Sequence, residues 1–407
     1  MIHETVVIGP LTRDFTRRDA AVSTGDAGVR WSQPGGAVWH AGLALVLASP
    51  LEEARVTVVA TAGPWARRCG LPGLAAAGVE CRGVESPRDT TFINRYDPDR
   101  RRQTLVSRAA PLPVTAVEAG VTDTPAVVVV SPLMPGDTPP GTARRMRDRG
   151  AFVAADAQGY LRATGAGGRI ETRRVDLRQA LDDAQAVKFS LREFRVWAGL
   201  GPAAEWRVAA ARAAGALAAE VLVSLGGEGA ALALPGEARV IDAPSPSLPG
   251  AADTTGAGDV LIAAYARARS LGLAPRSALE RAVEETHALL RRRAEAERRA
   301  EGSLLPVLRE LQRVAALTRR RVRRGEDCHA LFRPGGALAQ AVGGALRVGP
   351  PGMAADCAAD RGAAISGVCW ALFSGGWPDD PRLRAGALAA LVAAEERGLR
   401  GQSAPGC

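Results

Sequence analysis

The segment DTTGAGD at residues 253–259 has the clearest chemical potential in this sequence, and it runs directly into the apolar helix pattern VLIAAYARARSLGL. A Gly-Ala-Gly run that opens a helix offers unencumbered backbone N–H groups, and the helix N-terminus adds a partial positive charge. This combination favours an anion hole for the negative charge that builds up on a phosphoryl group during transfer. Asp259 lies at the same helix end, where its carboxylate can accept the proton of an attacking hydroxyl. The alternative is a capped turn in which Asp259 is an ordinary first-turn carboxylate.

Strand patterns and helix patterns alternate along the first 290 residues. The elements that they predict must position the DTTGAGD segment. The run PAVVVVSP at 125–132 is typical of a parallel strand that is buried on both faces. The alternation predicts an α/β fold, with a doubly wound, mostly parallel sheet and helices on both faces. Further strands are expected at 5–8, 54–63, 79–84, 151–159, 185–189 and 221–225, and helices at 37–49, 64–77, 141–150 and 203–219.

Two strand-like runs, TTFINRY at 90–96 and QTLVS at 103–107, are separated by the turn residues DPDRRR, which predicts a β-hairpin. A short strand is expected at 27–33, ending at a Pro-Gly-Gly turn.

The DTTGAGD segment resembles the C-terminal signature of the PfkB/ribokinase family of carbohydrate kinases. The resemblance implies a ribokinase-like fold in which Asp259 is the catalytic base. It implies that the backbone of Gly256, Ala257 and Gly258 forms the anion hole.

The resemblance extends to the expected acceptor side. Gly35 and Gly36 open the first apolar helix, as in the family's N-terminal Gly-Gly motif, where glycines let the backbone come close to a ligand. The family often has Asn five residues after the first Gly, whereas this chain has His40. Asp14 follows the first strand, where ribokinases place an Asp that binds substrate hydroxyls; the alternative is a surface Asp near a turn.

On the nucleotide side, the resemblance implies ATP and Mg²⁺ as cofactors. Glu193 corresponds to the acid of the family's Asn-x-x-Glu motif and would organise Mg²⁺ through water, whereas Ser190 replaces the Asn. The other residues expected to bind nucleotide are Lys188, Ser224, Gly226, Gly229 and Thr255. A plain hairpin turn is the alternative for the glycines.

The segment DAQGYLR at 156–162 is similar to the D-x-Q-x-x-x-R stretch of inositol kinase-like members. Arg162 would hold ATP phosphates or pair with a carboxylate. Residues 11–34 and 88–108 match the family's small β lid, which excludes water during transfer. Exposed lid edges tend to pair between subunits, so a homodimer through the lid is an expected partner arrangement.

The resemblance covers residues 1–290. The change of composition beyond it predicts a second unit over 291–407, an Arg-rich helix followed by a mainly helical, Gly/Ala-rich extension. Residues 284–300 carry acids and arginines where the family has a small-residue helix beside the adenine. The adenine pocket could be rebuilt by 300–407, nucleotide binding could be weakened, or the reading frame could be altered near residue 285.

The composition of the chain limits the classes of protein to which it can belong. The chain has 407 residues, 47% hydrophobic and 23% charged, with a formal net charge of +9 and a pI near 10.0. It contains no apolar run of 18 residues and no secretory pattern at its start, which favours a cytoplasmic protein without membrane partners. The six cysteines form no CxxC pair and match no zinc pattern.

These features together predict ATP-dependent phosphoryl transfer to a hydroxyl of a sugar or cyclic polyol. An inositol-like acceptor is expected first, and a pentose, hexose or nucleoside next. One alternative is a non-catalytic sugar or nucleotide sensor on a kinase scaffold. Another is nucleic-acid binding through the arginines of 291–324, which would be lost at high salt.

Overall fold

The computed structural model describes residues 3–291, except 19–30, 49–53, 98–99, 123, 182 and 249–253. The chain divides into two units, Met1–Arg291 and Arg292–Cys407, and all described residues belong to the first. The extension expected over 292–407 therefore lies outside the described residues, as does the first residue of the DTTGAGD segment.

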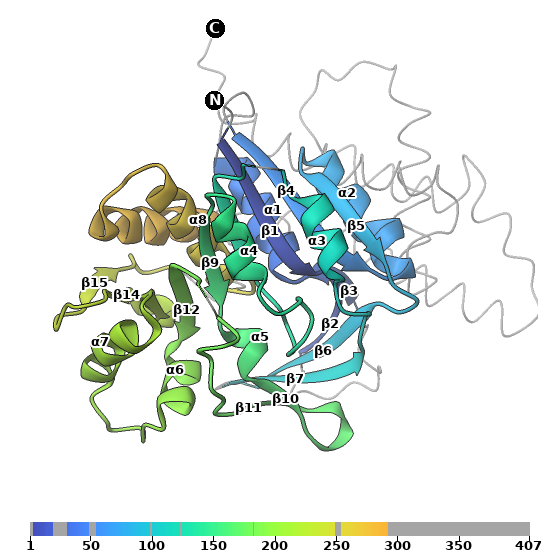
Figure 1. Cartoon of the computed structure of the whole chain (residues 1–407). Helices are drawn as coiled ribbons and strands as arrows, with labels where there is room; N and C mark the ends of the chain where they lie inside the picture. The colour runs from blue at the N-terminus through green and yellow to red at the C-terminus, as the bar shows by residue number, and fades with distance from the viewer. Residues whose placement is uncertain are drawn as a thin grey trace, which may run out of the picture. The chain divides into compact units, whose positions relative to one another are not determined.

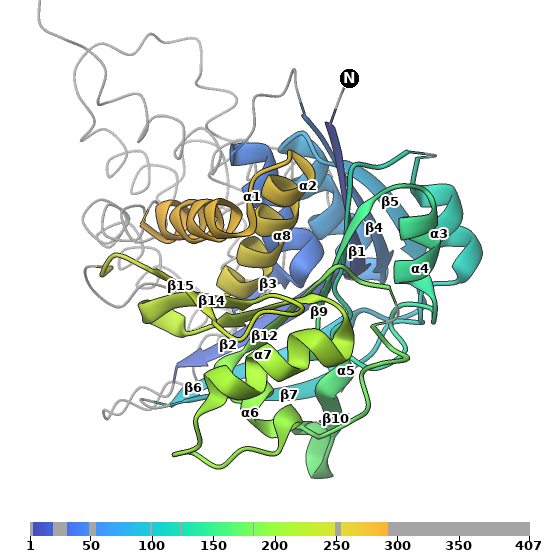
Figure 2. The ribbon, with the colours of Figure 1, turned by 60° about the vertical axis from the view of Figure 1, so that its left-hand side comes forward.

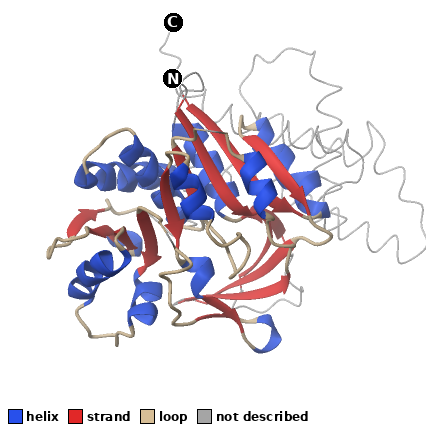
Figure 3. Cartoon of the chain, viewed as in Figure 1, coloured by secondary structure: helices blue, strands red, loops and turns tan. Residues whose placement is uncertain are grey.

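Within the described residues, a nine-stranded sheet runs in the order β15-β14-β13-β12-β9-β8-β1-β4-β5 (Figures 1 and 3). All pairs from β5 to β13 are parallel, and β14 and β15 are added antiparallel. The predicted mostly parallel sheet is confirmed. Its strands are β1 His3–Pro10, β4 Ala54–Ala62, β5 Glu80–Glu85, β8 Val127–Val130, β9 Phe152–Asp156, β12 Ala186–Ser190, β13 Glu220–Ser224, β14 Gly229–Ala233 and β15 Ile241–Pro244.

Helices cover both faces of this sheet because its central strands are apolar on both sides. In β8, Val127 and Val129 belong to one buried core with α1 and α8, whereas Val128 and Val130 belong to a second core on the other face. Burial of both faces explains the uninterrupted valine run. The helices are α1 Ala37–Ala48, α2 Leu71–Ala76, α3 Val114–Gly120, α4 Thr142–Asp148, α5 Gln158–Leu161, α6 Leu191–Ala198, α7 Trp206–Leu217 and α8 Ala257–Ser270, followed by helical residues at 275–291.

A second, four-stranded sheet has the order β3-β2-β6-β7 and consists of β2 Thr12–Arg18, β3 Trp31–Gly35, β6 Thr90–Asp97 and β7 Arg100–Ser107. The predicted hairpin is the antiparallel pair of β6 and β7. The short strand runs on through Pro34 and Gly35 instead of turning there. Proline is tolerated because β3 is an edge strand, where a missing N–H costs no ladder bond. The turn comes at Gly36, whose φ is +86°.

Some local predictions were incomplete. The helix expected at 64–77 is a π-helical turn, Ala66–Gly70, followed by the short α2. A second small ladder pairs β10 Arg162–Thr164 with β11 Ile170–Thr172, and two single turns lie at Ala166–Gly168 and Gly226–Glu228. Among the described helices, none combines the length and apolarity that crossing a membrane requires.

The small sheet lies across the carboxyl end of β1, because β2 follows β1 after only one residue (Figures 1 and 2). In open α/β sheets ligands bind outside the carboxyl ends of the parallel strands. The four-stranded sheet therefore lies where it can cover such a site.

Candidate active site

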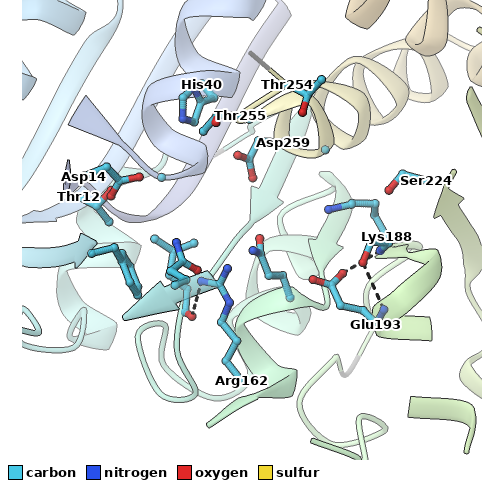
Figure 4. A pocket seen from close by; sticks show the side chains of 18 residues that line it. Thr12, Asp14, His40, Arg162, Lys188, Glu193, Ser224, Thr254, Thr255 and Asp259 are labelled. Carbon is cyan, nitrogen blue, oxygen red and sulfur yellow. Dashed lines mark hydrogen bonds between the residues drawn. The ribbon is translucent and has the colours of Figure 1, made fainter. Parts of the chain in front are cut away.

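A pocket of about 460 Å³ lies between the small sheet and the carboxyl ends of the main strands (Figure 4). Its walls come from β2, β6 and β7 on one side, from β12 and β13 on the other, and from the start of α8 between them. The predicted site residues that line it are Asp14, Gly36, His40, Lys188, Ser190, Glu193, Ser224, Thr255, Gly256, Gly258 and Asp259.

Four predicted site residues do not line the pocket. Gly35 lies behind Asp14, where a Cβ would come 2.6 Å from the Asp14 Oδ2 atom. Ala257 is the first residue of α8. Gly226 and Gly229 form the turn that joins β13 to β14, with φ of +66° and +107°. Their observed role is to shape that turn.

The start of α8 is built on Gly256, which has φ +81° and forms the N-cap. The Ala257 N–H donates to the Thr254 carbonyl at 3.1 Å, so this amide closes the turn. Gly258 lies in the first turn, where amides have no acceptor inside the helix. Of the three backbone amides expected in the anion hole, those of Gly256 and Gly258 are therefore better placed than that of Ala257 to donate to a ligand.

His40, on α1, packs directly against Gly256, and its side chain is only 7% exposed. A Cβ at Gly256 would collide with the His40 ring. The glycine is needed here for two reasons, its left-handed φ and this close approach. His40 therefore fixes where α8 begins as well as lining the pocket.

The half of the pocket in which the sequence predicts acceptor binding centres on Asp14, which is 4% exposed and lies within β2. Its Oδ1 atom accepts a 2.9 Å hydrogen bond from the Thr12 hydroxyl. A carboxylate held in this way is oriented to accept hydrogen bonds from ligand hydroxyls. The sequence analysis placed Asp14 after the first strand and did not predict β2, because β2 follows β1 so closely.

We expect Asp14→Asn to raise the KM for the acceptor about tenfold or more while kcat falls less, since the amide keeps the shape but loses a charge-assisted hydrogen bond. Steady-state kinetics with varied acceptor measures this. A matched control is Asp242→Asn, which removes a carboxylate from an exposed ion pair with Arg207. Unchanged acceptor KM in the Asp14 variant would remove it from the acceptor site.

The other half of the pocket is built from two register pairs at the carboxyl ends of neighbouring parallel strands. Lys188 of β12 lies opposite Asp156 of β9, and Ser190 lies opposite Ser224 of β13. The Lys188 Nζ atom donates to the Asp156 Oδ2 atom at 2.9 Å, and both side chains are buried. Burial lowers the pKa of Lys188, but the neighbouring carboxylates, first Asp156, outweigh burial and raise this pKa above its ordinary value.

Glu193 is oriented by a capping box at the start of α6. Its Oε2 atom accepts the Ser190 N–H at 2.8 Å, and the Ser190 hydroxyl accepts the Glu193 N–H at 3.3 Å. Ser-x-x-Glu is the sequence signature of this cap, which typically stabilises a helix by about 1 kcal/mol. The family resemblance implies a ligand motif at these residues, and the same pattern also predicts the start of α6.

The pocket fits a loosely held Mg²⁺ ion better than a fully protein-ligated one. No group of three or more His, Cys, Asp or Glu suited to a metal occurs among the described residues. Glu193 presents one fixed carboxylate to the pocket. Mg²⁺ commonly uses one or two carboxylates, several waters and substrate phosphates, which matches this donor set.

Several lining residues were not in the predicted site: Thr12, Phe92, Gln103, Leu133, Gln158 and Thr254. Arg162 also lines it; its guanidinium donates to the Leu133 carbonyl at 3.2 Å and lies 5.7 Å from the Phe92 ring centroid. Phe92 and Gln103 come from β6 and β7, so they reach the pocket only because the small sheet folds over it. No sequence spacing signals such contacts.

Comparisons with known proteins agree with this architecture. Residues 116–290 match the model of the pfkB family carbohydrate kinases. A sulfate complex of a pyrophosphate-dependent kinase in the ribokinase family has a similar structure, with 24% identity, coverage of 70% of this chain and 95% of the other, and a TM-score of 0.58. A complex of a pyrophosphate-dependent kinase in that family with a pyrophosphate analogue and myo-inositol matches with 22% identity. It covers 70% of this chain and 95% of that chain, with a TM-score of 0.58.

Ribokinase from Arabidopsis thaliana, complexed with ribose and ATP, matches with 19% identity, coverage of 70% of this chain and 92% of that chain, and a TM-score of 0.53. No curated protein matched the sequence. The structural likenesses establish the fold, and with the family match they confirm the predicted resemblance to the PfkB/ribokinase family.

Proposed function

We propose, from the match to pfkB family carbohydrate kinases and the ribokinase-like fold, that this chain transfers a phosphoryl group to a hydroxyl of a sugar or cyclic polyol. The observation that carries the proposal is the position of the first turn of α8. Asp259 and the Gly256 and Gly258 amides lie in one pocket wall, between Asp14 on one side and Lys188 on the other. The base and the anion hole thus lie between the residue proposed to bind the acceptor and the residue proposed to bind phosphate. Direct transfer requires this order.

In this proposal Asp259 accepts the proton of the acceptor hydroxyl as the hydroxyl oxygen attacks the terminal phosphorus of the donor. The amides of Gly256 and Gly258 stabilise negative charge on the transferring group. Asp14, Gly36 and His40 position the acceptor, and the small sheet excludes water. Mg²⁺, when bound near Glu193, supplies neutralisation of the donor's phosphate charge.

An inositol-like acceptor remains the first expectation. Its support is the polar character of the acceptor half, where Thr12, Asp14, His40 and Gln103 can each bind a hydroxyl. A solved neighbour is described in complex with myo-inositol, and the 156–162 segment resembles inositol kinase-like members. Pentoses, hexoses and nucleosides follow as candidates.

ATP and pyrophosphate are the two candidate donors for the other half of the pocket. The described side chains of Lys188, Ser190, Ser224 and Thr254 there can donate hydrogen bonds to phosphate oxygens, and Glu193 would face them through Mg²⁺. Two of the solved neighbours are described as pyrophosphate-dependent kinases. Pyrophosphate therefore stands beside ATP as a second candidate donor.

The test is phosphorylated-product formation across a panel of polyols, sugars and nucleosides, with Mg-ATP and Mg-pyrophosphate supplied in parallel. Acceptor-dependent product with either donor supports the kinase proposal, and the better donor is identified by kcat/KM. Binding of acceptor and donor without product would instead favour the sensor alternative.

A further inference from the structure

Lys188 is the only lysine in the chain, among 52 lysines and arginines. Every other basic residue is arginine, so the composition shows a complete bias against lysine except at this position. The exception is in the middle of β12, opposite the last residue of β9; it is 5% exposed and lines the pocket. A lone lysine in such a place calls for a property that arginine does not have.

The ammonium group of Lys188 is held by two neighbours. Asp156, which is fully buried, accepts one Lys188 N–H through Oδ2, and its Oδ1 atom accepts the Gln158 N–H at 3.0 Å. A Cβ at Gly258 would lie only 2.6 Å from Nζ, so the ammonium lies against the first turn of α8. Figure 4 shows the side chain directed into the pocket, toward the side where Asp259 lies.

This placement brings a cation close to the positive end of a helix. The two like charges repel, and such an arrangement is favourable only when negative charge lies nearby. The carboxylates of Asp156, Glu193 and Asp259 supply that charge in the ligand-free protein and hold the pKa of Lys188 above its ordinary value. Lys188 therefore stays charged, with two N–H donors beyond the one that Asp156 accepts.

The close approach to Gly258 also explains why the residue is lysine. An ammonium is a compact point charge, whereas a guanidinium is a wide planar fork. At 2.6 Å from the Cβ position of Gly258, the space suits the smaller group. Arginine would have to displace either Asp156 or the start of α8.

We propose that Lys188 is a catalytic residue whose ammonium contacts the phosphoryl group in transfer, together with the first-turn amides of α8. The proposal rests on the proposed function and goes beyond it, because Lys188 was expected only to bind nucleotide. Since the phosphoryl group is common to ATP and pyrophosphate, the contribution of Lys188 is the same with both donors.

The transfer step balances without any additional reactant. The acceptor oxygen forms a bond to the terminal phosphorus, and the bond from that phosphorus to the bridging oxygen breaks. The bridging oxygen keeps the electron pair and leaves as ADP or inorganic phosphate, and the acceptor proton goes to Asp259. Lys188 keeps its proton throughout and stabilises charge on the non-bridging oxygens.

The single lysine makes a direct test available. Protein labelled with ¹³Cε,¹⁵Nζ-lysine gives one lysine side-chain signal, which belongs to Lys188. Addition of magnesium pyrophosphate is expected to shift this signal, whereas inositol alone leaves it nearly unchanged. A purely structural lysine would show no shift with pyrophosphate.

Kinetics provides the second test. Lys188→Met is expected to lower kcat roughly 100-fold with either donor, with acceptor KM changed less than about threefold. Lys188→Arg is expected to recover little activity, because the space beside Gly258 is small. Arg207→Met, which removes an exposed cation from an ion pair outside the pocket, controls for net charge.

Removing Lys188 alone leaves Asp156 buried without its partner and could prevent folding. The double variant Asp156→Asn, Lys188→Met removes both charges and serves as the folded comparison in that case. Wild-type kcat in either variant would overturn the proposal. Equally tight binding of the active donor, ATP or pyrophosphate, to wild type and variant, measured by calorimetry, would also overturn it.

The two proposals can fail separately. Turnover by the wild-type protein that is insensitive to Lys188 overturns this inference and leaves the kinase function standing. Lysine-dependent pyrophosphate binding without turnover of any acceptor supports the phosphate contact and overturns the kinase function.

Discussion

Replacement of Asp259 by Asn is expected to lower kcat roughly 10³-fold, with donor and acceptor binding changed only a few-fold. The amide keeps the size and shape of the carboxylate but cannot accept the proton of the acceptor hydroxyl. Asp259 lines the pocket in the first turn of α8, where a carboxylate also stabilises the helix start modestly. A small loss of stability is therefore expected beside the large loss of turnover.

Product formation at saturating donor and acceptor measures this effect, and calorimetric binding of each substrate separates chemistry from affinity. Asp242→Asn is again the matched control, because it makes the same chemical change at an exposed ion pair outside the pocket. An Asp259→Asn variant with kcat within tenfold of wild type would mean that another group accepts the proton.

Gly256→Ala is expected to lower the free energy of unfolding by about 2–4 kcal/mol and to lower kcat at least tenfold. Two costs combine at this position. Alanine is strained at a φ of +81°, and its Cβ would collide with the buried His40 ring. Because Gly256 caps α8, any relief of this collision displaces the amides that we place in the anion hole.

Gly272→Ala separates these two costs. Gly272 has nearly the same φ, +85°, but a Cβ there would meet nothing within 4 Å. We expect Gly272→Ala to lower the free energy of unfolding by about 1 kcal/mol, which is the cost of the backbone conformation alone, and to leave kcat unchanged. Chemical denaturation of both variants gives the comparison. Equal losses of stability would show that the His40 contact does not constrain the start of α8.

The candidate site can be predicted from the sequence because its signals are local. DTTGAGD joins a left-handed glycine cap to the first turn of a helix, and α8 begins at Ala257 as this pattern indicates. The valine run predicted a strand buried on both faces, and its residues do alternate between two cores. Roles that depend on a ligand, such as the base role of Asp259, stay predictions.

Elements whose stability comes from their neighbours, rather than from their own residue pattern, could not be predicted from the sequence. The strand β2 carries several charged residues and follows β1 after one residue, so it shows no separate strand signal. It exists because it pairs with β3 on one side and β6 on the other. The antiparallel β14 and β15 likewise form by extending an existing sheet edge.

By itself, then, the sequence determined the α/β class, the start of α8 and the residue types available for the proposed phosphoryl transfer, since periodicity and capping act within a few residues. Only the tertiary structure decided which of these residues meet. Lys188 and Asp156 pair through strand register across 32 positions, and His40 of α1 packs on Gly256 of α8. Such contacts depend on sheet order and helix packing, and no local pattern in the sequence encodes them.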